Sequence, residues 1–364
     1  MNSPKKNIKI YSFFSGAGFL DLGFEQAGFE ISFVDEFNPI FLEAYKYARR
    51  NSGKFPEYGY STRSVEDFLD NSIWKQTFGK HSTEEMIGFI GGPPCPDFSV
   101  AGKNQGCRGE NGALTDIYTK LIMLRQPDFF VFENVKGLVQ TKKHRDFFNK
   151  EKKRLYRAGY SLWESLENAI EYGVPQDRER LILIGLRRKT FGKRILFNVN
   201  YSKKYHLKNI LTCSWPQKTP FVERQNLPMP RNIIEDLTVE YWFKHNHVES
   251  HINGNDIFRV KKKEKYMTIE EGNVSGKSFK RLHRWRYSPT AAYGNNEVHL
   301  HPYELRRLSV AEALAIQSLP QEFVLPAQLP LSAKFKMIAN GVPFLLAKAI
   351  ALHLYCFLER FIEE

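Results

Sequence analysis

The stretch IKIYSFFSGAGFLDLGF, residues 8–24, decides the fold. Its first half is mostly apolar, as in a buried strand, and its second half spaces apolar residues as a helix does. Gly16 and Gly18 lie between the halves, where they permit a tight turn and a close approach of the backbone to a ligand. A strand that passes through a glycine turn into a helix is the first unit of an α/β fold.

The same alternation continues along the first half of the chain. Further strands are predicted at 29–34, 86–90, 129–132 and 181–186, and helices at 39–50 and 114–125. We therefore predict an α/β fold with a parallel sheet and helices on both faces. Helical periodicity returns at 309–317 and 344–361.

Between these parts the pattern is irregular, with polar turns, prolines and a run of lysines. We predict three regions: a catalytic domain at 1–196, a smaller irregular domain at 197–303, and a C-terminal return to the first domain at 304–364.

Charge points to a polyanionic partner. The net charge is +13, and residues 201–290 hold 17 Lys and Arg against nine Asp and Glu. Nucleic acid is the expected partner. The four cysteines show no paired spacing, which favours a reducing cytoplasm, and the sequence shows no signal peptide or membrane span. We therefore expect a cytoplasmic protein with no membrane partner.

One cysteine has an unusual setting, in the segment GGPPCPDFS at 91–99. The glycines and prolines force a rigid turn after the strand at 86–90. A structural cysteine needs no such turn, whereas a nucleophile benefits from exposure at the carboxyl end of a strand. Cys95 is therefore a candidate nucleophile.

Charged residues follow two other strands of the predicted sheet. Glu133 comes at the end of the strand at 129–132, where it would meet Cys95. A thiol with a carboxylate suits attack on an electron-poor ring with acid assistance at a ring nitrogen. Arg178 and Arg180 share one face of an extended segment and offer planar donor forks.

The glycine turn favours a nucleotide-like cofactor other than NAD. Asp21 stands where the dinucleotide fingerprint has its third glycine. Glu36 follows the second strand, where a carboxylate can accept both hydroxyls of a ribose.

Taken together, these segments resemble the cytosine-5 DNA methyltransferases. The matching motifs occur in order and span nearly the whole chain: FFSGAGF (13–19), GGPPCPDFS (91–99), FENV (132–135), VPQDRER (174–180), RRLSVAEALAIQSLP (306–320) and ANGVP (339–343). The resemblance implies a Rossmann-like sheet that uses S-adenosyl-L-methionine, with residues 197–303 as the target-recognition domain and DNA in the basic cleft between the domains.

The resemblance also implies roles by position. Cys95 would attack carbon 6 of a flipped-out cytosine, Glu133 would protonate the ring near nitrogen 3, and Arg178 and Arg180 would position the base. Asn134 is expected to brace the catalytic loop. The residues expected around the cofactor are Phe14, Gly16, Ala17, Gly18, Glu36, Leu114 and Asn340.

The recognition domain is expected to contact DNA mostly through phosphates. The candidate DNA contacts are Ser99, Lys261, Lys262, Arg281, Arg284 and Arg286. His245, His247 and His251 lack a cysteine or acidic partner set, so ordinary surface histidines are expected and no metal.

Some positions depart from the family pattern. Pro96 replaces the usual Gln, Ala339 replaces a Gly, and the family's aspartate near adenine has no clear match. Ser64 occupies that place, with Asp67 as a substitute.

We expect methylation of duplex DNA at one short sequence, alongside a restriction endonuclease for the same site. A monomer suffices to methylate one strand at a time. A tRNA cytosine methyltransferase and a non-catalytic DNA-binding protein remain as alternatives.

Overall fold

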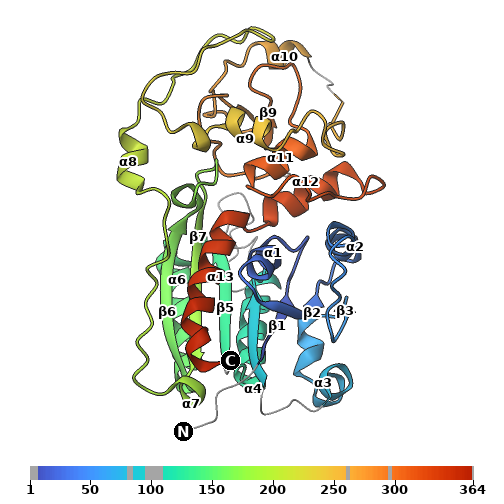
Figure 1. Ribbon diagram of the computed structural model, residues 1–364, viewed down its shortest axis with the longest axis vertical. Helices are drawn as coiled ribbons and strands as arrows, with labels where there is room; N and C mark the ends of the chain where they lie inside the picture. Colours follow the sequence, from blue (N-terminus) through green and yellow to red (C-terminus); the bar gives the residue numbers. More distant parts are fainter. Residues whose placement is uncertain (1–6, 80–84, 95–109, 260–262, 294–296, 363–364) are drawn as a thin grey trace.

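The computed structural model describes residues 7–79, 85–94, 110–259, 263–293 and 297–362, and the side chains of all of these except 110–112. Two parts are stacked along the long axis (Figure 1). The lower part holds the large sheet, and the upper part holds short helices, two short strands and long irregular segments.

The large sheet has seven strands in the order β3-β2-β1-β4-β5-β7-β6. Their bounds are β1 Asn7–Phe13, β2 Glu30–Asp35, β3 Tyr60–Ser61, β4 Glu85–Gly91, β5 Phe129–Val135, β6 Tyr160–Asn168 and β7 Glu179–Arg187. The first five run parallel, and every strand predicted from the sequence is present.

The prediction of an all-parallel sheet is wrong at one edge. β7 runs antiparallel to both β5 and β6. Only the short 3-10 turn η3 (Ala169–Tyr172) and a few further residues connect β6 to β7. A parallel pair needs a longer crossover, so this short connection dictates an antiparallel pair.

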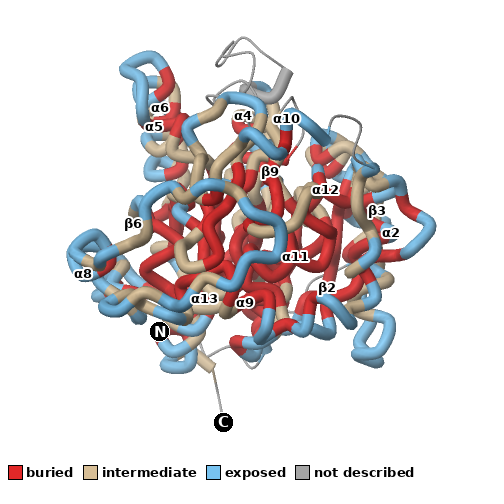
Figure 2. Tube along the Cα trace, turned by 90° about the horizontal axis from the view of Figure 1, so that it is seen from above, coloured by how far each residue is buried: buried red, intermediate tan, exposed pale blue. Residues whose placement is uncertain are grey.

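Helices cover both faces of the sheet, as predicted. One face packs its apolar side chains against α1 (Phe19–Gln26) and α13 (Phe344–Leu358). The other face packs against a second set of elements: η1 (Val65–Leu69), α3 (Asn71–Phe78), α4 (Glu110–Arg125) and α6 (Lys142–Arg157). The remaining helices of this part are α2 (Pro39–Ala48), α5 (Gly137–Gln140) and α7 (Arg188–Phe191). Figure 2 shows the buried centre and the exposed periphery.

The C-terminal helix closes the sheet-bearing part. α13 contacts α1 at Gly23, where an added Cβ would lie 2.7 Å from both the Cβ of Ala347 and the backbone nitrogen of Lys348. The glycine therefore lets the two helices approach closely.

The upper part has its own core. It comprises α8 (Leu207–Thr212), η4 (Glu235–Leu237), α9 (Val239–His245), α10 (Lys263–Met267), β8 (Phe279–Arg281), β9 (Val298–Leu300), α11 (Val310–Ile316) and α12 (Leu331–Asn340). α9, α11 and α12 share one hydrophobic cluster, which also reaches Ala17 and Phe19 at the start of α1.

Among the described residues, no single helix has both the length and the apolar character to cross a membrane; only α12 and α13 with η5 (Glu359–Phe361) pass that test, as a pair bent by 41°. The apolar side of α13 packs in the sheet's core.

Candidate active site

A buried ion pair lies where the carboxyl end of β5 meets the start of β7. Glu133 is 7% exposed and Arg180 is 7% exposed. The Nε of Arg180 lies 2.9 Å from Oε1 of Glu133. Because β7 is antiparallel to β5, its first residues lie beside the last residues of β5, with Arg180 opposite Val135. The strand pairing thus brings together two residues that the sequence predicted to act together.

The burial of Glu133 has an electrostatic consequence. Loss of solvent raises the pKa of its carboxyl group above the ordinary value, while the charges of Arg180 and then Arg178 act in the opposite direction. The net shift of the pKa is upward, so the protonated form of Glu133 is easier to populate here than it is for a carboxyl in water. A carboxyl of this kind can donate a proton to a ring nitrogen.

The turn that leads toward Cys95 begins against this carboxyl group. A Cβ added to Gly92 would lie 2.7 Å from Oε2 of Glu133, so only glycine leaves the carboxyl in place. The side-chain amide of Asn134 donates a hydrogen bond to the carbonyl of Pro93 at 3.3 Å and braces the turn as expected. Cys95 and Ser99 themselves lie outside the described residues.

Arg178, which the sequence predicted to position the base, is bound to backbone carbonyls instead. It is 1% exposed, and its two terminal nitrogens donate to the carbonyls of Ala291, Ala339 and Gly341 at 3.0, 2.5 and 3.1 Å. Both terminal nitrogens are thus engaged by backbone carbonyls, while the buried Nε has no hydrogen-bond partner among the described residues. Arg178 is a positioning residue that ties β7 to the upper part and to the segment before α13.

The glycine turn after β1 is tied to the end of β2. Glu36 accepts hydrogen bonds from the backbone nitrogens of Gly16 at 2.7 Å and Asn38 at 2.9 Å. Gly16 and Gly18 have φ angles of 57° and 78°, in the left-handed region that favours glycine. A Cβ on Gly18 would also lie 2.5 Å from the ring of Tyr45.

Two other expected cofactor residues, Phe14 and Ala17, belong to this turn, and neighbours of Leu114 and Asn340 contact residues beside it. Phe14 contacts the ring of Tyr118 on α4, one turn beyond Leu114. Gly341, next to Asn340, packs against Phe19, since a Cβ there would lie 2.1 Å from that ring. Ala17 is buried. The residues on either side of the turn therefore contact α4 and the segment before α13.

Phe37 is not among the residues that the sequence predicted for the site. Its side chain is 70% exposed, although it directly follows the largely buried Glu36. An exposed aromatic ring beside a carboxylate that faces a glycine turn matches the chemistry of a nucleoside, with a flat base and two ribose hydroxyls. The signal in the sequence was an aromatic residue immediately after the acid at the end of the second strand.

Asp21 is a structural residue. Its carboxyl accepts hydrogen bonds from Ser12 at 2.9 Å and Tyr45 at 3.0 Å, and burial raises its pKa to about 6. It joins β1, α1 and α2, which explains why an acid replaces the third glycine. Ser64 is likewise engaged, because its hydroxyl caps η1 by accepting from the nitrogen of Glu66.

Two predicted DNA contacts in the upper part are wrong. Arg281 is fully buried and donates to the backbone carbonyls of Tyr266, Ile269 and His301. Arg284 is 5% exposed. Its guanidinium forms two 2.9 Å hydrogen bonds with the carboxylate of Glu271.

Both arginines therefore hold the upper part together and cannot reach a phosphate. Arg286 is partly exposed, and Lys261 and Lys262 lie outside the described residues.

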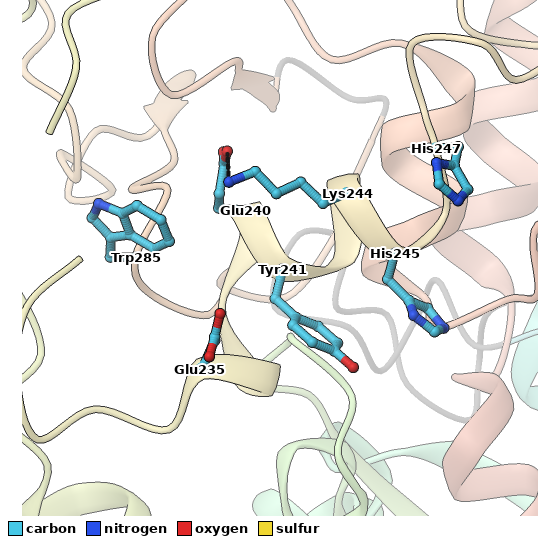
Figure 3. Close-up of a pocket in the computed structure, with 7 residues that line it drawn as sticks. All are labelled: Glu235, Glu240, Tyr241, Lys244, His245, His247 and Trp285. Carbon is cyan, nitrogen blue, oxygen red and sulfur yellow. Dashed lines mark ion pairs between the residues drawn. The ribbon is translucent and has the colours of Figure 1, made fainter. Parts of the chain in front are cut away.

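A surface pocket of about 320 Å³ lies along α9 (Figure 3). Its lining residues are Glu235, Glu240, Tyr241, Lys244, His245, His247 and Trp285. Lys244 pairs with Glu240 at 3.1 Å, and the rings of Tyr241 and His245 stack. Within the described part of the chain, no three His, Cys, Asp or Glu residues are grouped to hold a metal.

Comparisons with known proteins identify the family. Residues 8–356 match the model of the C-5 cytosine-specific DNA methylases. The chain is 54% identical to the Type II methyltransferase M.NmeDI of Neisseria meningitidis serogroup C, over all of this chain and 87% of that protein. It is 29% identical to the Type II methyltransferase M.MthTI of Methanothermobacter thermautotrophicus, over 95% and 96% of the two chains.

Two solved structures share the fold. The methyltransferase EhMeth of Entamoeba histolytica superposes with a TM-score of 0.62 at 13% identity, over 99% of this chain and 100% of that one. A DNMT2 variant of Spodoptera frugiperda superposes with a TM-score of 0.59 at 16% identity, over 97% and 100%. The ordered motifs, the fold and the full-length match agree: the chain belongs to the C-5 cytosine-specific DNA methylase family and is a DNA cytosine-5 methyltransferase.

Proposed function

We propose that this enzyme methylates carbon 5 of one cytosine within a short, defined sequence of duplex DNA, as the modification partner of a restriction endonuclease that cuts the same sequence. The observation that carries the proposal is the buried Glu133–Arg180 pair, which lies against Gly92 at the start of the turn that leads to Cys95. The 54% identity to a Type II methyltransferase supports the restriction–modification setting.

The chemistry follows from the weak reactivity of cytosine. Carbon 5 is a poor nucleophile until a thiolate adds to carbon 6 and nitrogen 3 gains a proton. Cys95 would form the sulfur–carbon bond, and Glu133 would donate the proton. Carbon 5 then takes the methyl group, its own proton leaves, and the bond from Cys95 to carbon 6 breaks. A base inside a duplex cannot reach these groups, so the cytosine must be flipped out.

Arg180 acts on this chemistry through Glu133. At 2.9 Å it fixes the direction of the carboxyl group, and its charge keeps the pKa of that group from rising further. Burial and Arg180 thus act in opposite directions on the proton that Glu133 would donate and later regain.

We propose that S-adenosylmethionine binds at the carboxyl ends of β1 and β2. The residues there fit it, because Glu36 can accept from ribose hydroxyls and the exposed ring of Phe37 can stack on adenine. The cofactor supplies an electrophilic methyl group. Further contacts are proposed for Phe14, Gly16, Ala17, Gly18, Leu114 and Asn340.

Residues 197–303 are proposed as the target-recognition domain. Arg286, Lys261, Lys262 and Ser99 remain predicted DNA contacts.

Bisulfite sequencing of plasmid DNA from cells that express the chain tests the proposal. Protected cytosines are expected in one recurring short sequence, and none with Cys95→Ser, whose DNA affinity should persist. A plasmid so modified should resist a restriction endonuclease of that sequence. Unprotected plasmid DNA together with methylated tRNA would contradict the proposal in favour of an RNA substrate.

A further inference from the structure

Helix α6 carries a strongly cationic face. Its 16 residues include eight Lys and Arg and two acids. The buried side consists of His144, Phe148, Glu151 and Leu155. Lys152 and Arg154 are engaged by Glu164 and Asp116. The exposed side presents the remaining six cations: Lys142, Lys143, Arg145, Lys150, Lys153 and Arg157.

Among the described residues none of these six cations forms an ion pair within 4.0 Å, and only Lys150 has a charge that acts on the buried Glu151. Asp146 is the one acid on the exposed side. Figure 2 places α5 and α6 at the outer edge of the molecule, beside largely exposed stretches. Such a concentration of unpaired charge repels itself and favours a polyanion.

The charges in the first turn of α6 do not stabilise the helix. The first turn contains Lys142 and Lys143 and no acid. The amino end of a helix carries a partial positive charge, so cations there are unfavourable. By contrast, Arg157 in the last turn interacts favourably with the opposite end. Helix stability therefore accounts for Arg157 but not for the two lysines.

The first turn of α6 is fixed close to the active site. β5 ends at Val135, two residues after Glu133, and only α5 separates it from α6. The ring of His144 contacts the carbonyl of Gly137 at 3.1 Å, and the Thr141 hydroxyl caps the helix. α6 then extends for about 24 Å, at about 1.5 Å per residue. The six cations thus differ in their distance from the catalytic edge.

We propose that Lys142, Lys143 and Arg145 bind backbone phosphates of the substrate duplex beside the target cytosine and outside the recognition sequence. This inference rests on the proposed placement of the target base at Glu133. Each DNA strand presents a phosphate about every 3.4 Å, so a duplex above this edge offers several within reach of one helical turn. The contacts add affinity without reading sequence.

The test compares two sets of three glutamine substitutions on the same helix. The near set is Lys142→Gln, Lys143→Gln and Arg145→Gln, and the matched far set is Lys150→Gln, Lys153→Gln and Arg157→Gln. Fluorescence anisotropy measures binding of a 30-base-pair duplex without the recognition sequence, at several salt concentrations. This readout needs no methylation, so it separates the inference from the proposed function, which is followed in parallel on plasmid DNA.

The near set should weaken binding by at least about tenfold at 100 mM salt and reduce the salt slope by about 2 to 3, at about 0.9 for each lost phosphate contact. The far set should change the slope by less than about 1. The near set should also keep or raise the melting temperature, because it removes cations from the amino end of the helix. Equal weakening by both sets, or an unchanged slope with the near set, would overturn the proposal. If the near set fails to fold, Lys142→Gln alone is judged by a slope change of about 1.

Discussion

Replacing Arg180 by methionine should make the stability of this enzyme depend on pH. The Arg180–Glu133 pair is almost fully buried, and the two groups are 2.9 Å apart. Removing an adjacent opposite charge raises a carboxyl pKa by about 1 to 3 units. Each unit corresponds to about 1.4 kcal/mol. Arg180→Met should therefore cost up to about 1.4 to 4 kcal/mol at a pH above the raised pKa.

The sign of the effect follows from linkage. In the variant, the folded-state pKa of Glu133 lies further above its unfolded value of about 4.3. A carboxyl with a raised pKa stabilises the fold at low pH, and this contribution is lost as the pH rises through the folded-state value. The free energies of unfolding of the variant and the parent should thus differ least near pH 5 and most near pH 8.

Thermal unfolding at pH 5 and pH 8 measures the effect. At about 2.1 cal/mol/K per residue, 364 residues lose about 0.8 kcal/mol of stability per degree, so the gap in melting temperature should widen by about 2 to 5 °C. The control combines Glu133→Gln with Arg180→Met, since glutamine does not titrate; its gap from Glu133→Gln alone should be independent of pH. A gap for Arg180→Met that is equal at both pH values would refute the assignment of Arg180 as the group that controls the Glu133 proton.

Three further changes probe separate parts of the site. Gly92→Ala should push the Glu133 carboxyl aside and lower kcat about 100-fold in steady-state kinetics. The circular dichroism spectrum should stay unchanged, and full activity would contradict the close contact. Glu36→Ala should weaken binding of S-adenosylhomocysteine by at least about tenfold in calorimetry, because the change removes charge-assisted hydrogen bonds of about 1.5 to 3 kcal/mol. An effect on DNA affinity alone would contradict the proposed role of Glu36 in cofactor binding. Arg284→Met should lower the free energy of unfolding by about 3 to 5 kcal/mol, while Arg286→Met should change it by no more than about 0.5 kcal/mol. Urea unfolding measures both values, and the reverse ranking would rule out the structural role of Arg284.

Periodicity and turn chemistry predicted most of the sheet, and the structure shows where they fail. β6 was missed because it is an edge strand whose side chains are mostly half-exposed, which weakens the apolar alternation. α6 was missed because His144 and Glu151 occupy buried positions where an apolar pattern would place hydrophobic residues. For α6, the buried His144 and Glu151 are held by hydrogen bonds to Gly137 and Arg154, which a hydrophobic pattern cannot show.

The site was predictable where it follows strand ends. Glu133 and Glu36 each come at the end of a strand, so their common edge follows from the topology. The partners of Arg178 were not predictable, since their carbonyls lie more than 100 residues further along the chain. Charge counting also failed for Arg281 and Arg284, because composition does not distinguish a buried guanidinium from an exposed one.

The contact between α1 and α13 has a consequence for synthesis on the ribosome. α1 is made long before its partner, because the contacting residues Gly23 and Ala347 are 324 residues apart in the sequence. Until then the sheet lacks one of the two helices that cover this face, and apolar side chains such as Leu20 and Phe24 lack their cover. The sheet-bearing part therefore completes its folding only after α13 has been made. Nascent chains that stall before residue 344 expose this face, so they depend on chaperones and make poor methyltransferases.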